Sequence, residues 1–525
     1  MTRGGMLARL RASNGTCDLA IIGGGATGVG IAVDAASRGY QVLLLEQHDF
    51  GKGTSSRSTK LVHGGVRYLE QGNIALVMEA LNERGMLRQN APHLVSNLAF
   101  VVPNYDWWEA PFYGIGLKIY DILAGKYGFG SSEILSRAET LRRLPTIKTE
   151  GLRGGVVYYD GQFDDARLLV SLVRTAAEHG ATLLNYTRVT GLTKDADGFV
   201  DGLVAHDAES GDTFQVRAAV VVNATGPFAD QVRHLAEPDA PALIAPSQGI
   251  HLVFERSFLP GESAIMVPHT SDGRVMFAIP WHAHTLVGTT DTPIDVPTLE
   301  PRPFNEEIDF ILETAGRYLH KAPTRADVLS VFVGIRPLVK SGDNTLTSAL
   351  SRGHTVHIDA SGLLTITGGK WTTYRRMAED TVTQAAELAG LPDRPCATRS
   401  LRLHGFHQAA QQFGSLSVYG SDAPAIQELM RVDPSLAAPL HPALPYTGAE
   451  VVWAVRHEMA RTIEDVLARR CRALFLNADA AVQMVPAVAT LMAGELGWDP
   501  TRIETETAAV LAVAKGYQIA SAAVR

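Results

Sequence analysis

Short apolar runs that end in glycine or in a polar residue alternate with helix-like stretches along the first half of the chain. The run at 18–22 ends in glycines and the run at 42–45 ends at Glu46, so each predicts a buried parallel strand. Residues 28–38, between the two runs, have a helical composition, and Gly39 suits the C-terminal cap of that helix. Together these segments predict a strand–helix–strand unit.

Similar patterns predict further helices and strands, and an antiparallel sheet beyond them. Apolar spacing predicts a helix at 74–90, and the run at 220–223 predicts a buried strand that turns sharply at its end. Residues 163–167 precede a predicted amphipathic helix that runs to Glu178, with Asp164 or Asp165 placed to cap it. Residues 246–300 alternate between apolar and polar character and contain turn residues, which predicts an antiparallel sheet inserted into the first fold. The stretch 105–130, rich in aromatic residues and glycine, predicts an exposed or interfacial excursion.

After Leu391 the pattern becomes helical, and residues 395–525 are predicted to form a separate helical domain. Apolar residues recur at helical spacing over 450–470, which predicts one helix. Asp465 and Arg469 fall one turn apart in that helix and predict an ordinary solvated ion pair.

The turn after the first predicted strand carries three glycines at dinucleotide-binding spacing, Gly23, Gly25 and Gly28. Such glycines permit a tight turn, close approach of the backbone to a diphosphate, and close packing of the helix on the sheet. The N–H groups and the positive end of the helix then bind the diphosphate. Glu46, at the end of the second strand, is placed to accept hydrogen bonds from an adenosine ribose. The unit therefore predicts a dinucleotide site.

Two later segments carry groups that suit a flavin and an anionic substrate. Residues 54–68 bring hydroxyl groups, two glycines, a lysine, a histidine and two arginines into one turn-rich stretch. This composition offers hydrogen bonds to a flavin and cations to an anion. Gly368 and Gly369 follow a predicted strand, and a helix is expected to begin at about Trp371. A helix N-terminus near the flavin would stabilise the anionic reduced ring.

The order of these motifs resembles that of the FAD-dependent glycerol-3-phosphate dehydrogenase family, within the D-amino-acid-oxidase-like flavoproteins. The resemblance covers about residues 17–475, and its motifs are Gly23–Gly28, Thr54–Tyr68, Asn223–Pro227, Gly288–Asp291, Gly334–Pro337 and Gly368–Arg375.

The resemblance implies an α/β fold in which a Rossmann-type FAD-binding domain carries an inserted antiparallel-sheet substrate domain and a C-terminal helical domain. The expected boundaries are 17–105, 150–245 and 330–392 for the discontinuous FAD-binding domain, 106–149 and 246–329 for the substrate or cap region, and 395–525 for the helical domain.

The resemblance also implies FAD as cofactor and oxidation of sn-glycerol 3-phosphate to dihydroxyacetone phosphate. It places the cations of Arg67, Arg336 and Lys370 over the flavin, where the planar fork of an arginine suits a phosphate, and it gives Tyr68 as a further substrate contact. The expected cofactor-binding residues are Gly23, Gly25, Gly28, Glu46, Thr54, Ser55, Ser56, Lys60, Leu61, His63, Val189, Gly226, Gly368 and Gly369.

His251 is the expected proton acceptor, because neutral imidazole accepts a proton near working pH. His63 could share that role or only hold the flavin, and Arg336 is a further catalytic candidate. No residue pattern indicates a metal site.

The net charge, the cysteines and the apolar runs of the chain limit the partners and the compartment that the sequence suits. A net charge of −8 argues against a nucleic-acid partner, and three widely separated cysteines suit a reducing compartment without disulfides. No apolar run reaches the roughly 18 residues that a membrane-spanning helix requires. Residues 1–16 carry arginines without an apolar core, which predicts a frayed basic tail or a shortened transit-like segment instead of a secretory signal.

The sequence does not identify the electron acceptor. The resemblance implies a membrane quinone, reached by a cytoplasmic protein attached peripherally to the inner face of the cell membrane, or to an inner mitochondrial membrane in a eukaryote. Residues 107–129, with Lys118 and Lys126, and apolar patches of the helical domain are candidate membrane contacts. The alternatives are an oxidase that releases hydrogen peroxide, an amine-oxidising enzyme, and a flavin-binding protein without turnover. A homodimer is one option for the oligomeric state.

Overall fold

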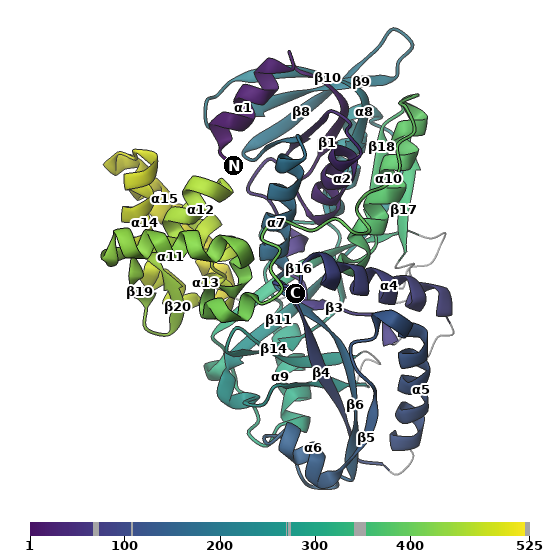
Figure 1. Ribbon diagram of the computed structural model, residues 1–525, viewed down its shortest axis with the longest axis vertical. Helices are drawn as coiled ribbons and strands as arrows, with labels where there is room; N and C mark the ends of the chain where they lie inside the picture. Colours follow the sequence, from purple (N-terminus) through teal and green to yellow (C-terminus); the bar gives the residue numbers. More distant parts are fainter. Residues whose placement is uncertain (67–72, 107–108, 269, 271–274, 341–352, 520–525) are drawn as a thin grey trace.

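The computed structural model describes residues 1–66, 73–106, 109–268, 270, 275–340 and 353–519. Two large sheets form the body of the protein, and the helical C-terminal segment lies beside them (Figure 1). The predicted α/β fold, with a Rossmann-type sheet, an antiparallel sheet and a helical C-terminal segment, is confirmed.

The first sheet has eight strands in the order β17-β18-β10-β1-β2-β7, with β9 paired to β10 and β8 to β9. Its central strands are parallel and most of their residues are buried, as expected for strands that are covered on both faces. They are β1 (Thr16–Ile22), β2 (Val42–Leu45), β7 (Thr182–Leu184), β10 (Thr213–Asn223) and β18 (Leu364–Gly368). The antiparallel strands are β8 (Thr187–Lys194), β9 (Val200–Asp207) and β17 (His354–Ile358).

The helices α2 (Ala26–Ser37), α7 (Asp165–Glu178) and α10 (Tyr374–Leu388) pack on this sheet. Of the two aspartates predicted as candidates, Asp164 caps α7, and its Oδ1 accepts a hydrogen bond from the Arg167 amide at 3.1 Å. The prediction of a frayed basic tail at the N-terminus is wrong, because α1 (Arg3–Ala12) is ordered against the sheet. Arg3 is buried there and forms an ion pair of 2.7 Å with Asp207.

The second sheet has ten strands in the order β15-β11-β14-β13-β12-β4-β6-β3, with β16 paired to β11 and β5 to β6. It contains the antiparallel strands predicted within 246–300 and extends well beyond them. Its strands are β3 (Leu61–Val62), β4 (Val95–Asn104), β5 (Glu133–Ser136), β6 (Gly154–Phe163), β11 (Ile244–Glu255), β12 (Ser263–Val267), β13 (Met276–Trp281), β14 (His284–Gly288), β15 (Thr292–Pro293) and β16 (Ser330–Val339).

The strand pairing differs from the expected domain boundaries at four strands. β3, β4, β6 and β16 belong to the second sheet, although the sequence assigned 61–62, 95–105, 150–163 and 330–339 to the FAD-binding domain. Hydrophobic alternation identifies a strand but not the sheet that it joins. The division into domains stays a prediction.

The remaining helices of this part are α4 (Ile74–Asn90), α5 (Glu109–Ala124), α6 (Arg137–Arg143), α8 (Ala229–Ala236) and α9 (Asn305–Tyr318). The helix predicted at 74–90 is confirmed. The stretch predicted as an excursion contains the four-turn helix α5, which lies along the edge of the molecule beside β5 and β6 (Figure 1).

The C-terminal segment contains a two-stranded ribbon and five helices among its described residues: β19 (Pro439–His441), β20 (Leu444–Thr447), α11 (Ala423–Val432), α12 (Gly448–Glu458), α13 (Ala473–Leu476), α14 (Ala478–Leu496) and α15 (Pro500–Ala514). The single helix predicted over 450–470 is wrong. α12 ends at Glu458, since Met459 has a left-handed φ of 56°. The Asp465 carboxylate then accepts from two nearby backbone amides and starts a separate π-helical turn, Asp465–Arg470.

The C-terminal segment shares a hydrophobic core with the second sheet. Phe475 of α13 lies 4.9 Å, centroid to centroid, from Phe332 of β16. The ion pair predicted between Asp465 and Arg469 is present at 2.8 Å, but it is buried instead of solvated. Arg469 also contacts Asp49 in the loop after β2, so the C-terminal segment packs directly on the nucleotide-binding half.

Among the described residues, none of the helices combines the length and the apolar character needed to cross a membrane.

Candidate active site

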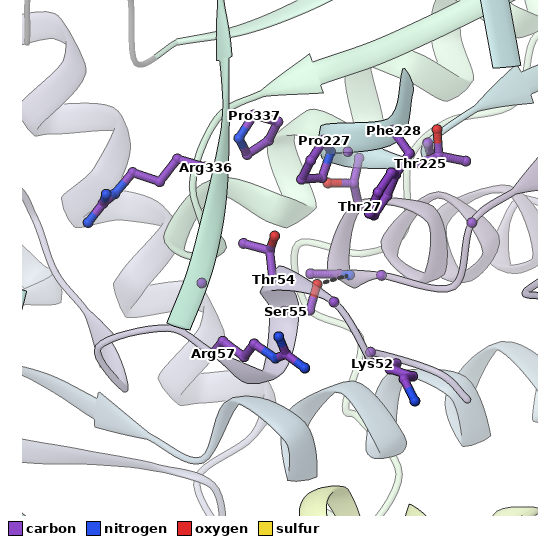
Figure 2. Close-up of a pocket in the computed structure, with 18 of the residues that line it drawn as sticks. Thr27, Lys52, Thr54, Ser55, Arg57, Thr225, Pro227, Phe228, Arg336 and Pro337 are labelled. Atoms are coloured by element: carbon purple, nitrogen blue, oxygen red, sulfur yellow. Dashed lines mark hydrogen bonds between the residues drawn. The ribbon is translucent and has the colours of Figure 1, made fainter. Parts of the chain in front are cut away.

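A cavity of about 730 Å³ lies where the two large sheets meet, a volume typical of small-molecule sites. The carboxyl ends of β1, β2 and β10 open into it, which is where ligands bind in open α/β sheets. In the middle of the view in Figure 2 are Thr54 and Ser55. They lie between Arg57 and Lys52 on one side and Thr27, Thr225, Pro227 and Phe228 on the other. The predicted site residues that line it are Gly23, Gly25, Glu46, Thr54, Ser55, Leu61, His63, Val189, Gly226, His251, Arg336, Gly368, Gly369 and Lys370.

The glycine turn between β1 and α2 leaves no room for side chains. A Cβ on Gly23, whose φ is 109°, would lie 2.7 Å from the Ala224 carbonyl oxygen. A Cβ on Gly28 would lie only 2.0 Å from the Gly23 carbonyl oxygen, so Gly28 packs behind the cavity and does not line it. The turn therefore brings bare backbone and the start of α2 to the cavity, which fits the diphosphate of a dinucleotide cofactor.

Glu46 lines the cavity where the sequence placed it, and it also shapes the turn. Its Oε2 accepts from the Gly24 amide at 2.7 Å, and its Oε1 accepts from the His48 amide at 2.9 Å. Burial raises the pKa of this carboxyl group, while the two amides oppose that rise. The contact of Glu46 with an adenosine ribose stays a prediction.

The loop from 54 to 61 contributes all of its residues except Ser56 and Lys60 to the cavity lining. Ser55 Oγ accepts from the Ala26 amide at 2.8 Å, and Thr54 Oγ1 donates to the Ile335 carbonyl at 2.6 Å. These bonds join the loop to the N-terminus of α2 and to β16. Leu61, also predicted, lines the cavity at the start of β3.

Two predicted cofactor contacts, Ser56 and Lys60, lie outside the cavity and behind its wall. Lys60 is fully buried, and its ammonium donates to Asp165 Oδ2 at 2.6 Å and to the Ser56 carbonyl at 2.8 Å. Burial lowers the pKa of Lys60 to about 7, and the Asp165 carboxylate opposes that fall. The two residues therefore support the loop and do not line the cofactor cavity.

His251 of β11 lies in the cavity wall and is almost fully buried. Its Nε2 is 2.9 Å from Thr59 Oγ1, and its ring stacks on Phe332 with centroids 4.9 Å apart. Burial, followed by the charges of Lys60 and Arg336, lowers the pKa of His251 well below its usual value. The imidazole is therefore neutral at neutral pH and can accept a proton.

His63 and Arg336 reach the same cavity from other elements. The His63 amide donates to Thr372 Oγ1 at 3.2 Å, which joins the end of β3 to the turn before α10. Arg336 of β16 donates from Nη2 to the Thr290 carbonyl at 2.8 Å, and its Nη1 lies 3.2 Å from Asp291 Oδ1. These contacts orient the guanidinium in the cavity wall.

The predicted turn before α10 is confirmed. Gly368 ends β18, and a 3₁₀ turn, Trp371–Thr373, starts at the residue expected for the helix. A Cβ on Gly369 would lie 2.4 Å from the Met377 sulfur atom, so the turn requires glycine there. Lys370 lines the cavity at this turn.

Arg67 and Tyr68, predicted to bind the substrate, lie outside the described residues. The roles of the individual site residues stay predictions.

Sequence reasoning missed several lining residues: Lys52, Arg57, Thr59, Thr225 and Trp371. Each lies within or beside a motif that was recognised, so proximity to the motif was the available signal. The direction of each side chain in an irregular loop could not be obtained from the pattern. Across the ranges that the structure describes, no cluster of His, Cys, Asp and Glu side chains is arranged to hold a metal ion.

Comparison with known proteins identifies the family. The family model described as FAD dependent oxidoreductase matches residues 18–375, and the model described as C-terminal domain of alpha-glycerophosphate oxidase matches residues 364–503. The chain is 42% identical to probable glycerol-3-phosphate dehydrogenase, mitochondrial, of Caenorhabditis elegans, over 92% of this chain and 71% of that protein. It is also 42% identical to the mitochondrial glycerol-3-phosphate dehydrogenase of Homo sapiens, with the same two coverages.

A solved structure agrees with these relatives. The glycerol-3-phosphate dehydrogenase from Bacillus halodurans, complexed with FAD, matches with a TM-score of 0.80 and 30% identity over 100% of this chain and 99% of that chain. The match includes the helical C-terminal segment as well as both sheets. The chain is an FAD-dependent oxidoreductase and belongs to the family of FAD-dependent glycerol-3-phosphate dehydrogenases.

Proposed function

We propose that this chain oxidises sn-glycerol 3-phosphate to dihydroxyacetone phosphate and passes the electrons to a membrane quinone. The observation that carries the proposal is that His251 and Arg336 line the same cavity as the dinucleotide turn. A neutral acceptor for a hydroxyl proton and a cation for a phosphate are thereby available beside the cofactor. The names of the relatives support the choice of substrate.

Residues of the glycine turn, Glu46, and the turn at Gly368 would hold the FAD, which when bound accepts the hydride of the substrate carbon. His251 takes the proton of the secondary hydroxyl, so the alcohol becomes a ketone with the loss of one hydride and one proton. Arg336 and Lys370 bind the phosphate by charge-assisted hydrogen bonds, and Arg67 is a third candidate from the sequence. Burial of His251 keeps its imidazole neutral before the proton arrives.

The test is to assay the purified protein with glycerol 3-phosphate against a quinone analogue, an artificial dye and oxygen, with glycerol as the control substrate. We expect the quinone analogue and the dye to be reduced, and glycerol to be a poor substrate because it lacks the phosphate. Oxygen consumed in equal amount to the substrate, with peroxide released, would instead favour the oxidase. No turnover with any acceptor would contradict the proposal.

Replacing Glu46 with alanine is expected to weaken FAD binding about ten-fold or more. The change removes a carboxylate that would bond the ribose and that bonds the Gly24 amide at 2.7 Å, a loss of roughly 1.5 to 3 kcal/mol. FAD affinity of the apoprotein is measured by quenching of flavin fluorescence, with the exposed Glu313→Ala as control. Unchanged affinity in Glu46→Ala would remove the assignment.

Helix α5 supplies the surface that we propose for membrane contact. Phe112, Ile115, Ile119 and Ile122 recur at helical spacing and are 44% to 78% exposed. Lys118 and Lys126 lie on the same stretch, with Lys118 bonded to the Ser132 carbonyl. Exposed apolar residues and nearby lysines are the combination that binds anionic lipid surfaces. Trp107 and Trp108, also candidates, lie outside the described residues.

We expect the double variant Ile115→Ser, Ile122→Ser to lose co-sedimentation with anionic liposomes while dye-coupled activity stays near wild type. These two side chains are 66% and 78% exposed, so their loss should not disturb the core. Phe199→Ser, which changes a 52% exposed residue on the β8–β9 hairpin, is the matched control. Equal sedimentation of the double variant and the control would move the membrane contact to another surface.

The remaining parts of the proposal are the location and the oligomeric state. The location proposed with the quinone and lipid contact is the cytoplasmic face of a cell membrane, or an inner mitochondrial membrane in a eukaryote. A homodimer stays an open prediction, which light scattering of the purified protein would test.

A further inference from the structure

Thr59 lies between the cavity and the proposed base. It lines the cavity, and its Oγ1 is 2.9 Å from His251 Nε2. The other ring nitrogen, Nδ1, has no hydrogen-bond partner among the described residues. The threonine hydroxyl is therefore the polar contact that fixes the imidazole, and the Phe332 ring fixes its plane.

The backbone immediately after Thr59 has an unusual conformation. Lys60 has a φ of 65°, a left-handed conformation that costs a residue with a long side chain about 1 kcal/mol or more. The Lys60 amide donates to Ser58 Oγ at 3.1 Å, and the Lys60 side chain turns into the protein. Thr59 and Lys60 thus face opposite directions, one toward the cavity and one away from it.

Three buried charged residues hold this shape, and we call them the Asp165 cluster: Lys60, Asp165 and Arg472. Asp165 Oδ2 accepts from Lys60 at 2.6 Å and from the Ser58 hydroxyl at 2.8 Å, while its Oδ1 accepts from Arg472 at 3.1 Å. Arg472 also donates to the Ser56 carbonyl at 2.7 Å. All three residues of the cluster are at most 1% exposed.

The cluster joins three parts of the chain that are distant in sequence. Lys60 belongs to the cavity loop, Asp165 to the first turn of α7, and Arg472 to the C-terminal segment. The Lys60 ammonium also lies 4.9 Å from the centre of the Phe332 ring, the ring on which His251 stacks. The cluster therefore supports both contacts of the imidazole.

We propose that Thr59 is a positioning residue that orients His251 toward the substrate, and that the Asp165 cluster holds Thr59 in place. The inference rests on the proposed role of His251 as proton acceptor. A hydroxyl is suited to this task because it can donate to a neutral ring nitrogen or accept from a protonated one. The C-terminal segment, through Arg472, thereby contributes to the active site without touching the substrate.

The first experiment compares Thr59→Val with Thr59→Ser by stopped-flow flavin reduction at saturating glycerol 3-phosphate. We expect Thr59→Val to be about ten-fold slower, the effect of one hydrogen bond of about 1.4 kcal/mol, with substrate affinity changed less than about three-fold. Thr59→Ser, which keeps the hydroxyl, should restore most of the rate. The control is Thr381→Val, which removes a buried hydroxyl that bonds only within α10.

The outcomes separate this inference from the proposed function. If Thr59→Val keeps the wild-type rate while His251→Ala is slow, the positioning role is wrong and the base assignment stands. Equal losses in Thr59→Val and Thr381→Val would also overturn it. If His251→Ala itself reduces flavin at the wild-type rate, the base assignment fails and the inference fails with it.

A second experiment tests the cluster through Lys60→Met, which keeps the length of the side chain and removes its charge. Lys60 and Arg336 are the charged groups that lower the pKa of His251, so the variant should raise that pKa. The acidic limb of the flavin-reduction profile should then move to higher pH, because a protonated imidazole cannot accept a proton. A slower rate together with an acidic limb at higher pH would support the role of the cluster. An acidic limb at the same pH as in the wild type would overturn that role.

Discussion

Replacing His251 with alanine is expected to slow flavin reduction by glycerol 3-phosphate about 10²-fold or more at saturating substrate. The variant removes the acceptor of the hydroxyl proton but leaves the glycine turn, Glu46 and Arg336 in place. FAD content and substrate binding should therefore change much less than the rate. Stopped-flow reduction under anaerobic conditions measures the step directly.

The pH dependence of the wild-type protein gives an independent check of the same residue. Burial, Lys60 and Arg336 lower the pKa of His251, so its imidazole is neutral throughout the neutral range. The reduction rate should therefore stay level through the neutral range and fall only at pH values below the usual titration range of a histidine. His320→Ala, an exposed histidine remote from the cavity, is the control. A wild-type rate in His251→Ala would mean that the base lies elsewhere, with His63 the next residue to examine.

The sequence predicted the elements that carry strong local signals. The strand–helix–strand unit, the helix at 74–90 and the narrowing of the α7 cap to Asp164 or Asp165 depend on periodicity, glycine spacing and capping groups within a few residues of one another. The break after Glu458 was missed because an apolar stripe continues across it. That break is stabilised by Asp465 and by contacts with distant segments, which periodicity does not reveal.

The residues of the site also divide into those that a local motif determines and those that depend on contacts with distant segments. Gly23, Glu46 and Gly369 could be predicted because each occupies a position in a motif whose backbone geometry demands that residue. Lys60 stands in such a motif, yet its side chain turns away from the cavity because Asp165 binds it from a helix more than a hundred residues later. Thr59 was missed because its hydrogen-bond partner, His251, lies on β11, which is distant in sequence. Side-chain direction in a loop depends on tertiary partners.

The second large effect is expected on stability, in the buried ion cluster between the nucleotide-binding half and the C-terminal segment. Asp49 is fully buried and bonds Arg469 at 2.5 Å and Arg470 at 2.7 and 2.9 Å. Asp49→Ala should lower the free energy of unfolding by about 3 to 5 kcal/mol, because it leaves two buried guanidinium groups without their shared carboxylate. The melting temperature and FAD retention at a fixed heating rate should both fall.

The pH dependence of this effect has a definite sign. Burial opposes ionisation of Asp49, but Arg470 and Arg469 outweigh it and lower the pKa to about 2. A carboxyl group whose pKa is lower in the folded state stabilises the fold above its unfolded pKa of about 4, and that contribution disappears as the pH falls toward 2. The difference in melting temperature between wild type and Asp49→Ala should therefore be full at pH 7 and shrink below about pH 4.

A matched control is available on α11, where Arg431 forms a bidentate pair with Glu428 at 2.6 and 2.7 Å. Both side chains are exposed to solvent, so Arg431→Ala should leave the melting temperature unchanged. The hydrogen-bond distances around Asp49 and around Arg431 are similar. A difference in melting temperature between the two variants therefore reports the effect of burial and not of hydrogen-bond geometry. Equal melting temperatures for Asp49→Ala and wild type would mean that the C-terminal segment is held by its apolar core around Phe332 and Phe475 and not by these charges.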